Sequence, residues 1–198
     1  TKNVILSWVN FLEKDLLPRS SGSYPVGKEH YQLLLRKRHF LNLSAEELLS
    51  LGEKLFAKTK IELAKTAAEI APGQSIQELT LKIQKNCPQA SELLPSYQRA
   101  MEAARDFVRK NDLVSFPPRE ELKVVPTPEF ERHVIPFAAY LPPSPNDSTQ
   151  LGHYYVTPVT DNDLLREHNR IGLENTSVHE SYPGHHLQFA TANCIPEA

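Results

Sequence analysis

Residues 179–186 read His-Glu-Ser-Tyr-Pro-Gly-His-His, and this stretch sets both the fold and the site that we expect. Four of its side chains can bind a metal ion or activate a water molecule: His179, Glu180, His185 and His186. A single histidine is usually an ordinary surface or core residue. Three histidines and a glutamate so close together instead favour a metal site, for which zinc is the expected ion.

The spacing of these residues resembles the helical motif of zinc peptidases, with one change. In that motif the first histidine binds zinc, the adjacent glutamate is the general base, and a second histidine follows one turn later. Here that later position is Pro183, which cannot bind a metal. His185 and His186 come six and seven positions after His179, and neither reaches the same ion on an ideal helix. Pro183 and Gly184 permit a break that would bring a later histidine back to the ion.

Two points about the motif stay open at this stage. Zinc peptidases often carry glycine directly before the second histidine, which favours His185 as the ligand and leaves His186 in a supporting position. Residues 177–180 (Ser-Val-His-Glu) also have the pattern of a helix N-terminal capping box. In that interpretation Glu180 would cap a helix instead of activating water.

Upstream of the motif, the chain predicts helices first and short strands later. Apolar spacing and two capping boxes predict helices over residues 4–16, 30–40, 45–70, 76–86 and 91–110. The last of these helices should be kinked or restarted at Pro95. After residue 112 prolines become frequent, and strand propensity predicts strands over residues 123–125, 135–141 and 153–159. A helix over residues 163–173 should lead into the motif.

These elements predict a mainly α protein with a small β-sheet, of the α+β class. We expect a helical N-terminal part over residues 1–112. Residues 113–198 should form a proline-rich strand region and the start of the metal-site helix, and the two parts should form one structural unit. With 40% hydrophobic residues among 198, the chain can bury a core.

Composition and charge exclude several classes of function. The formal net charge is −2 and there is no basic stripe, so nucleic acid is not an expected partner. No apolar run approaches the roughly 18 residues of a membrane span. Thr1 is not a natural start, so a secreted, periplasmic or lipoprotein location is open if a signal was removed. The chain stops shortly after the motif, and we expect it to be a fragment of a longer protein.

The string HESYPGHHLQ (His179–Gln188) resembles the signature of domain-of-unknown-function family 885, His-Glu-x-x-Pro-Gly-His-His-x-Gln. That family is grouped with the HExxH zinc metallopeptidase clan. Softer landmarks extend the resemblance over most of the chain: Gly27–Tyr31, Leu43–Leu48 with Gly52, Pro126–Phe130, Ala139–Pro143 and Gly152–Val156.

The resemblance implies a mainly helical, zincin-like metallopeptidase architecture that is C-terminally truncated here. It implies that His179 and His185 are zinc ligands and that Glu180 is the general base. The third ligand would be a glutamate on a later helix, beyond residue 198, so the fragment itself would lack a complete site. The strand over residues 153–159 would be an edge strand lining the cleft. There Tyr154 or Tyr155 would steady the oxyanion, or both would be plain sheet residues.

The leading hypothesis is therefore a zinc-dependent hydrolase, in the first place a peptidase acting on a peptide-like substrate. One alternative is a helical binding or scaffold protein with a structural or degenerate metal site. Another is a zinc hydrolase of non-peptide amides or esters. A structural zinc site is closed by four protein ligands, whereas a catalytic site keeps one position open, so coordination separates the first two hypotheses.

Overall fold

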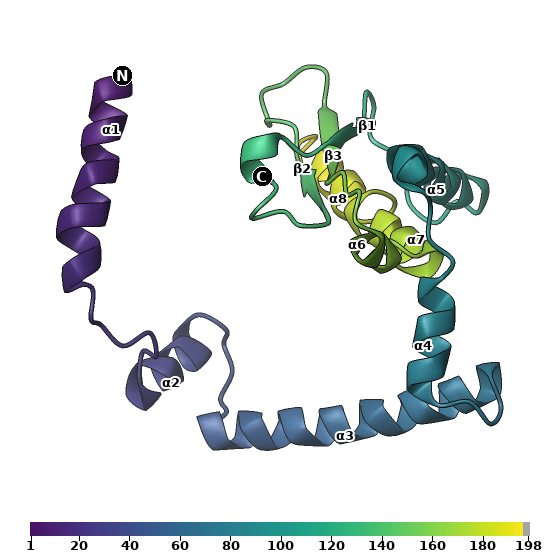
Figure 1. Ribbon diagram of the computed structural model, residues 1–198, viewed down its shortest axis with the longest axis horizontal. Helices are drawn as coiled ribbons and strands as arrows, with labels where there is room; N and C mark the ends of the chain where they lie inside the picture. The colour runs from purple at the N-terminus through teal and green to yellow at the C-terminus, as the bar shows by residue number, and fades with distance from the viewer. Residues whose placement is uncertain (196–198) are drawn as a thin grey trace. The chain divides into compact units, whose positions relative to one another are not determined.

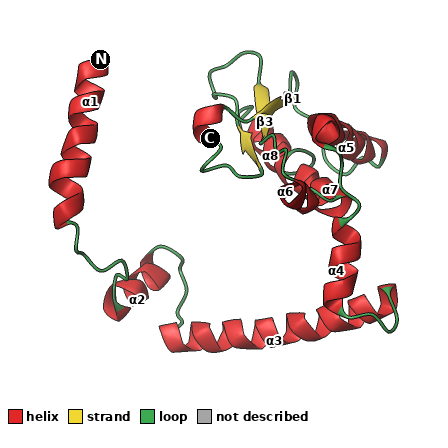
Figure 2. Cartoon of the chain, in the orientation of Figure 1, coloured by secondary structure: helices red, strands yellow, loops and turns green. Residues whose placement is uncertain are grey.

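The computed structural model describes residues 1–195, which form helices and one small three-stranded sheet (Figures 1 and 2). The prediction of a mainly helical α+β protein is confirmed. The chain divides into two compact units, Thr1–Thr66 and Ala67 onward. This boundary reflects contacts between residues, whereas the boundary expected at residue 112 followed the change from helices to strands.

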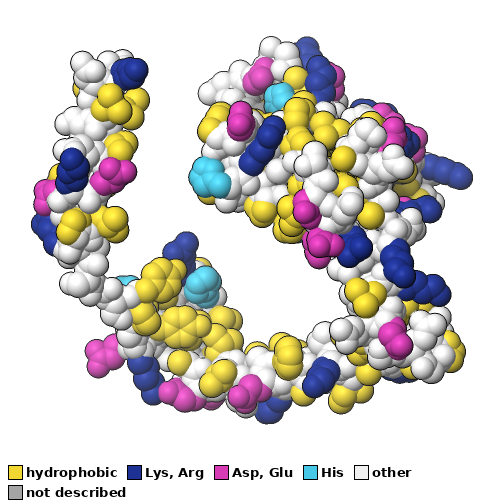
Figure 3. All heavy atoms as spheres, in the orientation of Figure 1, with side chains coloured by type: hydrophobic (Ala, Val, Ile, Leu, Met, Phe, Trp, Pro, Cys, Tyr) yellow, Lys and Arg dark blue, Asp and Glu magenta, His cyan; other side chains and the backbone are white. Residues whose placement is uncertain are grey.

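The first unit consists of helices that the sequence predicts. Its elements are α1 (Lys2–Phe11), which continues as a π-helical turn and a 3-10 turn to Arg19, α2 (Lys28–Lys37), and most of α3 (Ala45–Ile70). The capping box before α3 is present, since the Glu47 amide donates to the Ser44 hydroxyl at 3.1 Å. Many apolar side chains of this unit are exposed (Figure 3), with Leu35 its one described buried hydrophobic residue.

The helices that open the second unit are α4 (Ile76–Gln84) and α5 (Leu93–Lys110). A capping box between Ser75 and Glu78 starts α4, as predicted. The predicted kink at Pro95 is wrong, because Pro95 lies in the first turn of an uninterrupted α5. Amide groups in a first turn have no acceptor within the helix, so proline costs no hydrogen bond there.

The sheet has the order β1-β3-β2. Its strands are β1 (Glu121–Pro126), β2 (Ala138–Leu141) and β3 (Leu151–Val156). Strand β3 pairs in parallel with β1 and antiparallel with β2. It is therefore the central strand, and the expectation of an edge strand at residues 153–159 is wrong. Pro158 follows the end of β3, where its missing amide hydrogen breaks no ladder.

One face of the sheet packs on the helices of the second unit. Leu122 and Tyr154 from the sheet join a buried cluster with Tyr97 and Met101 of α5. Leu173 and Leu187, from the helices that carry the motif, also belong to this cluster. The core thus links the sheet to both the α5 helix and the motif.

The segment before the motif forms three helices, α6 (Asn162–Glu167), α7 (Arg170–Glu180) and α8 (His185–Ala192). The single helix predicted over residues 163–173 is wrong, because Asn169 caps a new helix by accepting from the Gly172 amide at 3.0 Å. The motif spans the end of α7 and the start of α8. Among the described residues, no helix is both long and apolar enough to cross a membrane.

The break between α6 and α7 buries His168, whose exposed fraction is 1%. Its Nδ1 lies 2.9 Å from the Tyr97 hydroxyl, and its Nε2 has no partner. Burial lowers the pKa of this imidazole below its ordinary value of 6.5. His168 is therefore a structural core residue.

Stability should fall as the pH drops below 6.5, because the unfolded chain then protonates His168 while the folded chain resists. The stabilisation is complete above pH 6.5 and is lost as the pH falls toward the lowered pKa. The slope from this residue is at most about 1.4 kcal/mol per pH unit. In urea unfolding, His168→Gln should reduce this pH dependence. His133→Gln, which changes an exposed histidine, should keep it. An undiminished slope in His168→Gln would contradict the assignment.

Candidate metal centre

A tight turn between α7 and α8 brings the two halves of the motif together. Helix α7 ends at Glu180, and α8 begins at His185 after a cis Tyr182–Pro183 bond. A Cβ atom on Gly184 would overlap the backbone carbonyl oxygens of Val178 and His179. Glycine is thus required where the chain passes the end of α7, and the break that Pro-Gly predicts is present.

The turn places three metal-binding side chains at one point. The ligand atoms of His179, Glu180 and His185 all lie within 4.8 Å of one another. The two imidazole rings meet nearly edge to face, with centroids 4.6 Å apart at 82°. Ligand atoms on a tetrahedral zinc ion are about 3.4 Å apart, so only small side-chain movements would bring these atoms to one ion.

The cluster is open to solvent on one side. His179 is exposed, and Glu180 and His185 are half-buried. Both histidines line a shallow pocket with Val178, Pro183 and Gln188. A ligand could therefore approach an ion held by these side chains.

The capping-box interpretation of residues 177–180 is wrong. Glu180 is the last residue of α7, whereas a capping box lies at the start of a helix. Ser177 is fully buried inside α7, and its carbonyl oxygen accepts from the Ser181 amide at 2.9 Å. The Glu180 carboxylate is thus available for another role.

The second histidine of the pair turns away from this cluster. His186 is fully buried, with Nε2 3.0 Å from Glu120 Oε2 and Nδ1 3.2 Å from the Tyr140 hydroxyl. A Cβ atom on Gly152 of β3 would lie 2.8 Å from His186 Nδ1, so the small residue makes room for this ring. The structure brings His185, and not His186, to His179 and Glu180.

Glu120, just before β1, is a residue that the sequence analysis did not single out. Its side chain is 2% exposed and forms ion pairs with Arg105 at 2.6 Å and Arg109 at 3.3 Å. Burial alone would raise the pKa of Glu120, but hydrogen bonds with His186, Tyr182 and Arg105 outweigh it, so the pKa is lowered. Glu120 lies far from the motif in sequence, and no local pattern marks it.

The comparison with known proteins gives the family of this chain. The family model described as "Bacterial protein of unknown function (DUF885)" matches residues 2–197. The chain belongs to this family. No curated protein matches the sequence.

The fold of this DUF885 chain is similar to a crystal structure described as "the putative lipoprotein from Colwellia psychrerythraea". The two share 18% sequence identity with a TM-score of 0.67, over 86% of this chain. At this identity the likeness concerns the fold alone. The matched region is 29% of the Colwellia chain, so the DUF885 chain spans less than a third of that protein.

Neither Tyr154 nor Tyr155 presents a free side chain to the cluster, as stabilisation of an oxyanion would require. Tyr154 is fully buried, and its hydroxyl lies 3.4 Å from the Ser177 hydroxyl. Burial, aided by the nearby Glu180 carboxylate, raises the pKa of this phenol. Tyr155 points to the opposite face of the sheet, beside His153. The geometry favours a structural role in the sheet for both tyrosines.

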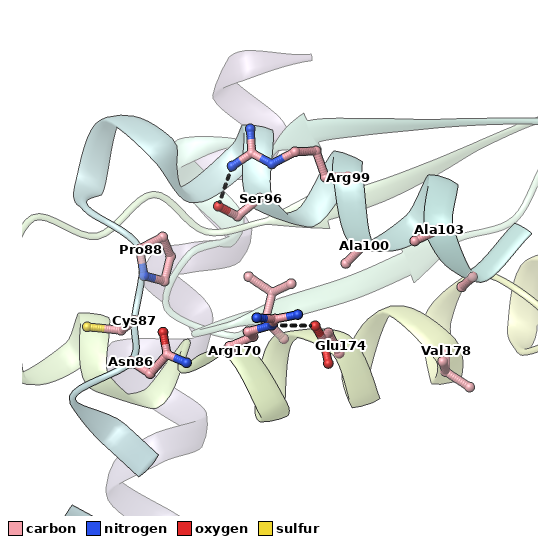
Figure 4. Close-up of a pocket in the computed structure, with 12 residues that line it drawn as sticks. Asn86, Cys87, Pro88, Ser96, Arg99, Ala100, Ala103, Arg170, Glu174 and Val178 are labelled. Carbon is pink, nitrogen blue, oxygen red and sulfur yellow. Dashed lines mark hydrogen bonds and ion pairs between the residues drawn. The ribbon is translucent and has the colours of Figure 1, made fainter. Parts of the chain in front are cut away.

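A second pocket, of about 510 Å³, lies between α5 and α7 (Figure 4). Ala100 and Ala103 line it from α5, opposite the Arg170–Glu174 ion pair on α7, which measures 2.8 Å. Val178 lines both this pocket and the one beside the histidines. Val178, the residue before His179, is thus a wall that the two pockets share.

Proposed function

We propose that this chain carries the zinc-binding and proton-transfer residues of a zinc-dependent peptidase. The observation that supports this most is the turn at Gly184, which returns His185 to the side of His179 with Glu180 next to them. Two imidazoles and one carboxylate on an open surface are the side chains that zinc hydrolases use.

The two histidines that this chain could supply as ligands fit a zinc ion. A catalytic zinc ion takes three protein ligands and keeps one position open. His179 and His185 would be two of the ligands. The third would be a glutamate from a later part of a longer chain, as the resemblance implies. The Colwellia structure, of which this chain matches 29%, is that of a longer protein with a similar fold.

Zinc bound here would polarise a substrate carbonyl and lower the pKa of a bound water toward about 7. Glu180 would accept the proton of the attacking water and pass it to the leaving amine. Its half-buried carboxylate lies next to both imidazoles, which would put it close to a water on an ion that they hold.

Strand β2 is a better candidate than the central strand β3 for holding a peptide substrate. Among the described residues its outer edge has no strand partner, since β3 occupies the other side. It also packs beside α7, which carries His179 and Glu180. An extended peptide can add to a free strand edge through main-chain hydrogen bonds. This arrangement favours a peptide over other amides or esters.

Zinc content tests the site. Elemental mass spectrometry of the full-length protein should find about one zinc ion per chain, as expected for one catalytic site. His179→Ala and His185→Ala should lose it. His153→Ala, which changes a histidine on the other face of the sheet, should keep it. Zinc retained in both site variants, or absent from the unmodified protein, would refute the proposal.

A further inference from the structure

We infer that Glu120 is a positioning residue that clamps the turn at Gly184 and thereby holds His185 beside His179. This inference rests on the proposed zinc site. It concerns a residue that touches neither the ion nor the substrate in that proposal.

The two oxygens of the Glu120 carboxylate hold different parts of the molecule. Oε1 accepts from Arg105 at 2.6 Å and from Arg109 at 3.3 Å, which ties it to α5. Oε2 accepts from the Tyr182 hydroxyl at 2.6 Å and lies 3.0 Å from His186 Nε2. The carboxylate therefore joins a helix of the core to the turn of the motif.

The two partners on the turn stand two residues before and two residues after Gly184. Tyr182 and His186 are both fully buried, and both contact the same carboxylate oxygen. Since they flank the turn, fixing them fixes the path of the chain between α7 and α8. The Tyr140 hydroxyl holds the other nitrogen of the His186 ring at 3.2 Å.

The anchored ring determines where its neighbour points. Consecutive residues on a helix are about 100° apart, so His186 and His185 face different directions on α8. With the His186 ring held in the core, the rotation of α8 is set, and His185 is directed outward to His179. An eight-residue helix is not stable in isolation, so the orientation of α8 depends on its buried residues, His186 together with Leu187 and Ala190.

The charged and polar partners of Glu120 favour a carboxylate that keeps its contacts permanently. A buried carboxylate is costly unless it is paired and hydrogen-bonded, and two arginines and two further donors meet Glu120. As an ionised group it only accepts, so His186 Nε2 carries a hydrogen and donates it to Glu120.

Glu120→Gln tests the inference because it keeps the shape and removes the charge. In the metal-free protein, nuclear Overhauser contacts between the ring protons of His179 and His185 should be lost. Zinc affinity should fall about 10-fold to 100-fold, as for other residues that support metal ligands. The absorption spectrum of the Co²⁺-substituted protein should change. Tyr182→Phe, which keeps the ring and removes one bond to Glu120, should show smaller changes in the same direction.

Thr157→Val is the control for lost stability alone. It removes a buried hydroxyl that donates to the Ile135 carbonyl oxygen and lies 2.9 Å from the Thr127 hydroxyl, with no partner in the motif. It should lower the melting temperature yet leave the ring contacts, zinc affinity and Co²⁺ spectrum unchanged. The inference is overturned if Glu120→Gln keeps all three, or if Thr157→Val alters them equally. If Glu120→Gln does not fold, Tyr182→Phe decides by the same criteria.

The ring contacts separate this inference from the proposed function, because they need no metal. If the unmodified protein binds no zinc but Glu120→Gln loses the contacts, the peptidase proposal fails and the clamp stands. If zinc binds normally and Glu120→Gln changes nothing, the clamp fails and the zinc site stands.

Discussion

Replacing Glu180 by glutamine should abolish hydrolysis while leaving zinc bound. Glutamine keeps the shape of the side chain but cannot accept the proton of the attacking water. General base catalysis contributes about 10²-fold to 10⁴-fold, so turnover should fall by at least that factor. The measurement is turnover of a peptide substrate by the full-length protein, together with its zinc content.

Glu174→Gln is the matched control for this change. Glu174 lies on the same helix, six residues earlier, and pairs with Arg170 where both line the pocket between α5 and α7. Its replacement should leave turnover near the unmodified level. Retained turnover in Glu180→Gln would end the general-base assignment. Loss of zinc in that variant would instead make Glu180 a ligand.

Replacing Gly184 by alanine should disrupt both the turn and the metal site. The added Cβ would overlap the carbonyl oxygens of Val178 and His179, which belong to the α7 backbone and cannot move aside as a side chain could. Overpacking of this kind costs about 1–3 kcal/mol, and relief requires α8 to shift. His185 would then leave His179, and zinc binding should be lost.

Gly172→Ala, within α7, provides the control. A Cβ there would meet its nearest neighbour at 3.5 Å, an ordinary contact, and alanine favours a helix over glycine by about 1 kcal/mol. The melting temperature and zinc content of both variants make the comparison. A Gly184→Ala protein with normal stability and one zinc ion would show that the turn tolerates a side chain.

Many of the helices follow from local rules that the sequence displays directly. Ser44 and Ser75 start α3 and α4 through capping boxes, which depend on residues only three positions apart. The α+β class and the strand regions follow from periodicity and propensity in the same way. The break at Pro183-Gly184 is local too, since it depends on a missing amide hydrogen and a missing side chain.

The wrong predictions concern the context of an element. Pro95 was expected to kink a helix, but its effect depends on the helix starting at Leu93. Strand β3 was expected at an edge, but its central place depends on pairing with β1 and β2, from distant parts of the chain. Propensity describes a strand and does not describe its neighbours.

By itself, the sequence determined the residue types of the candidate site and the break that allows them to meet. Only the tertiary structure decided that His185 joins His179 while His186 enters the core. It also revealed Glu120, whose partners lie on α5 and on the motif. The physical reason is the distance along the chain over which each interaction acts. Capping and helix breaking act within about four residues, whereas burial and ion pairing depend on which distant segments pack together.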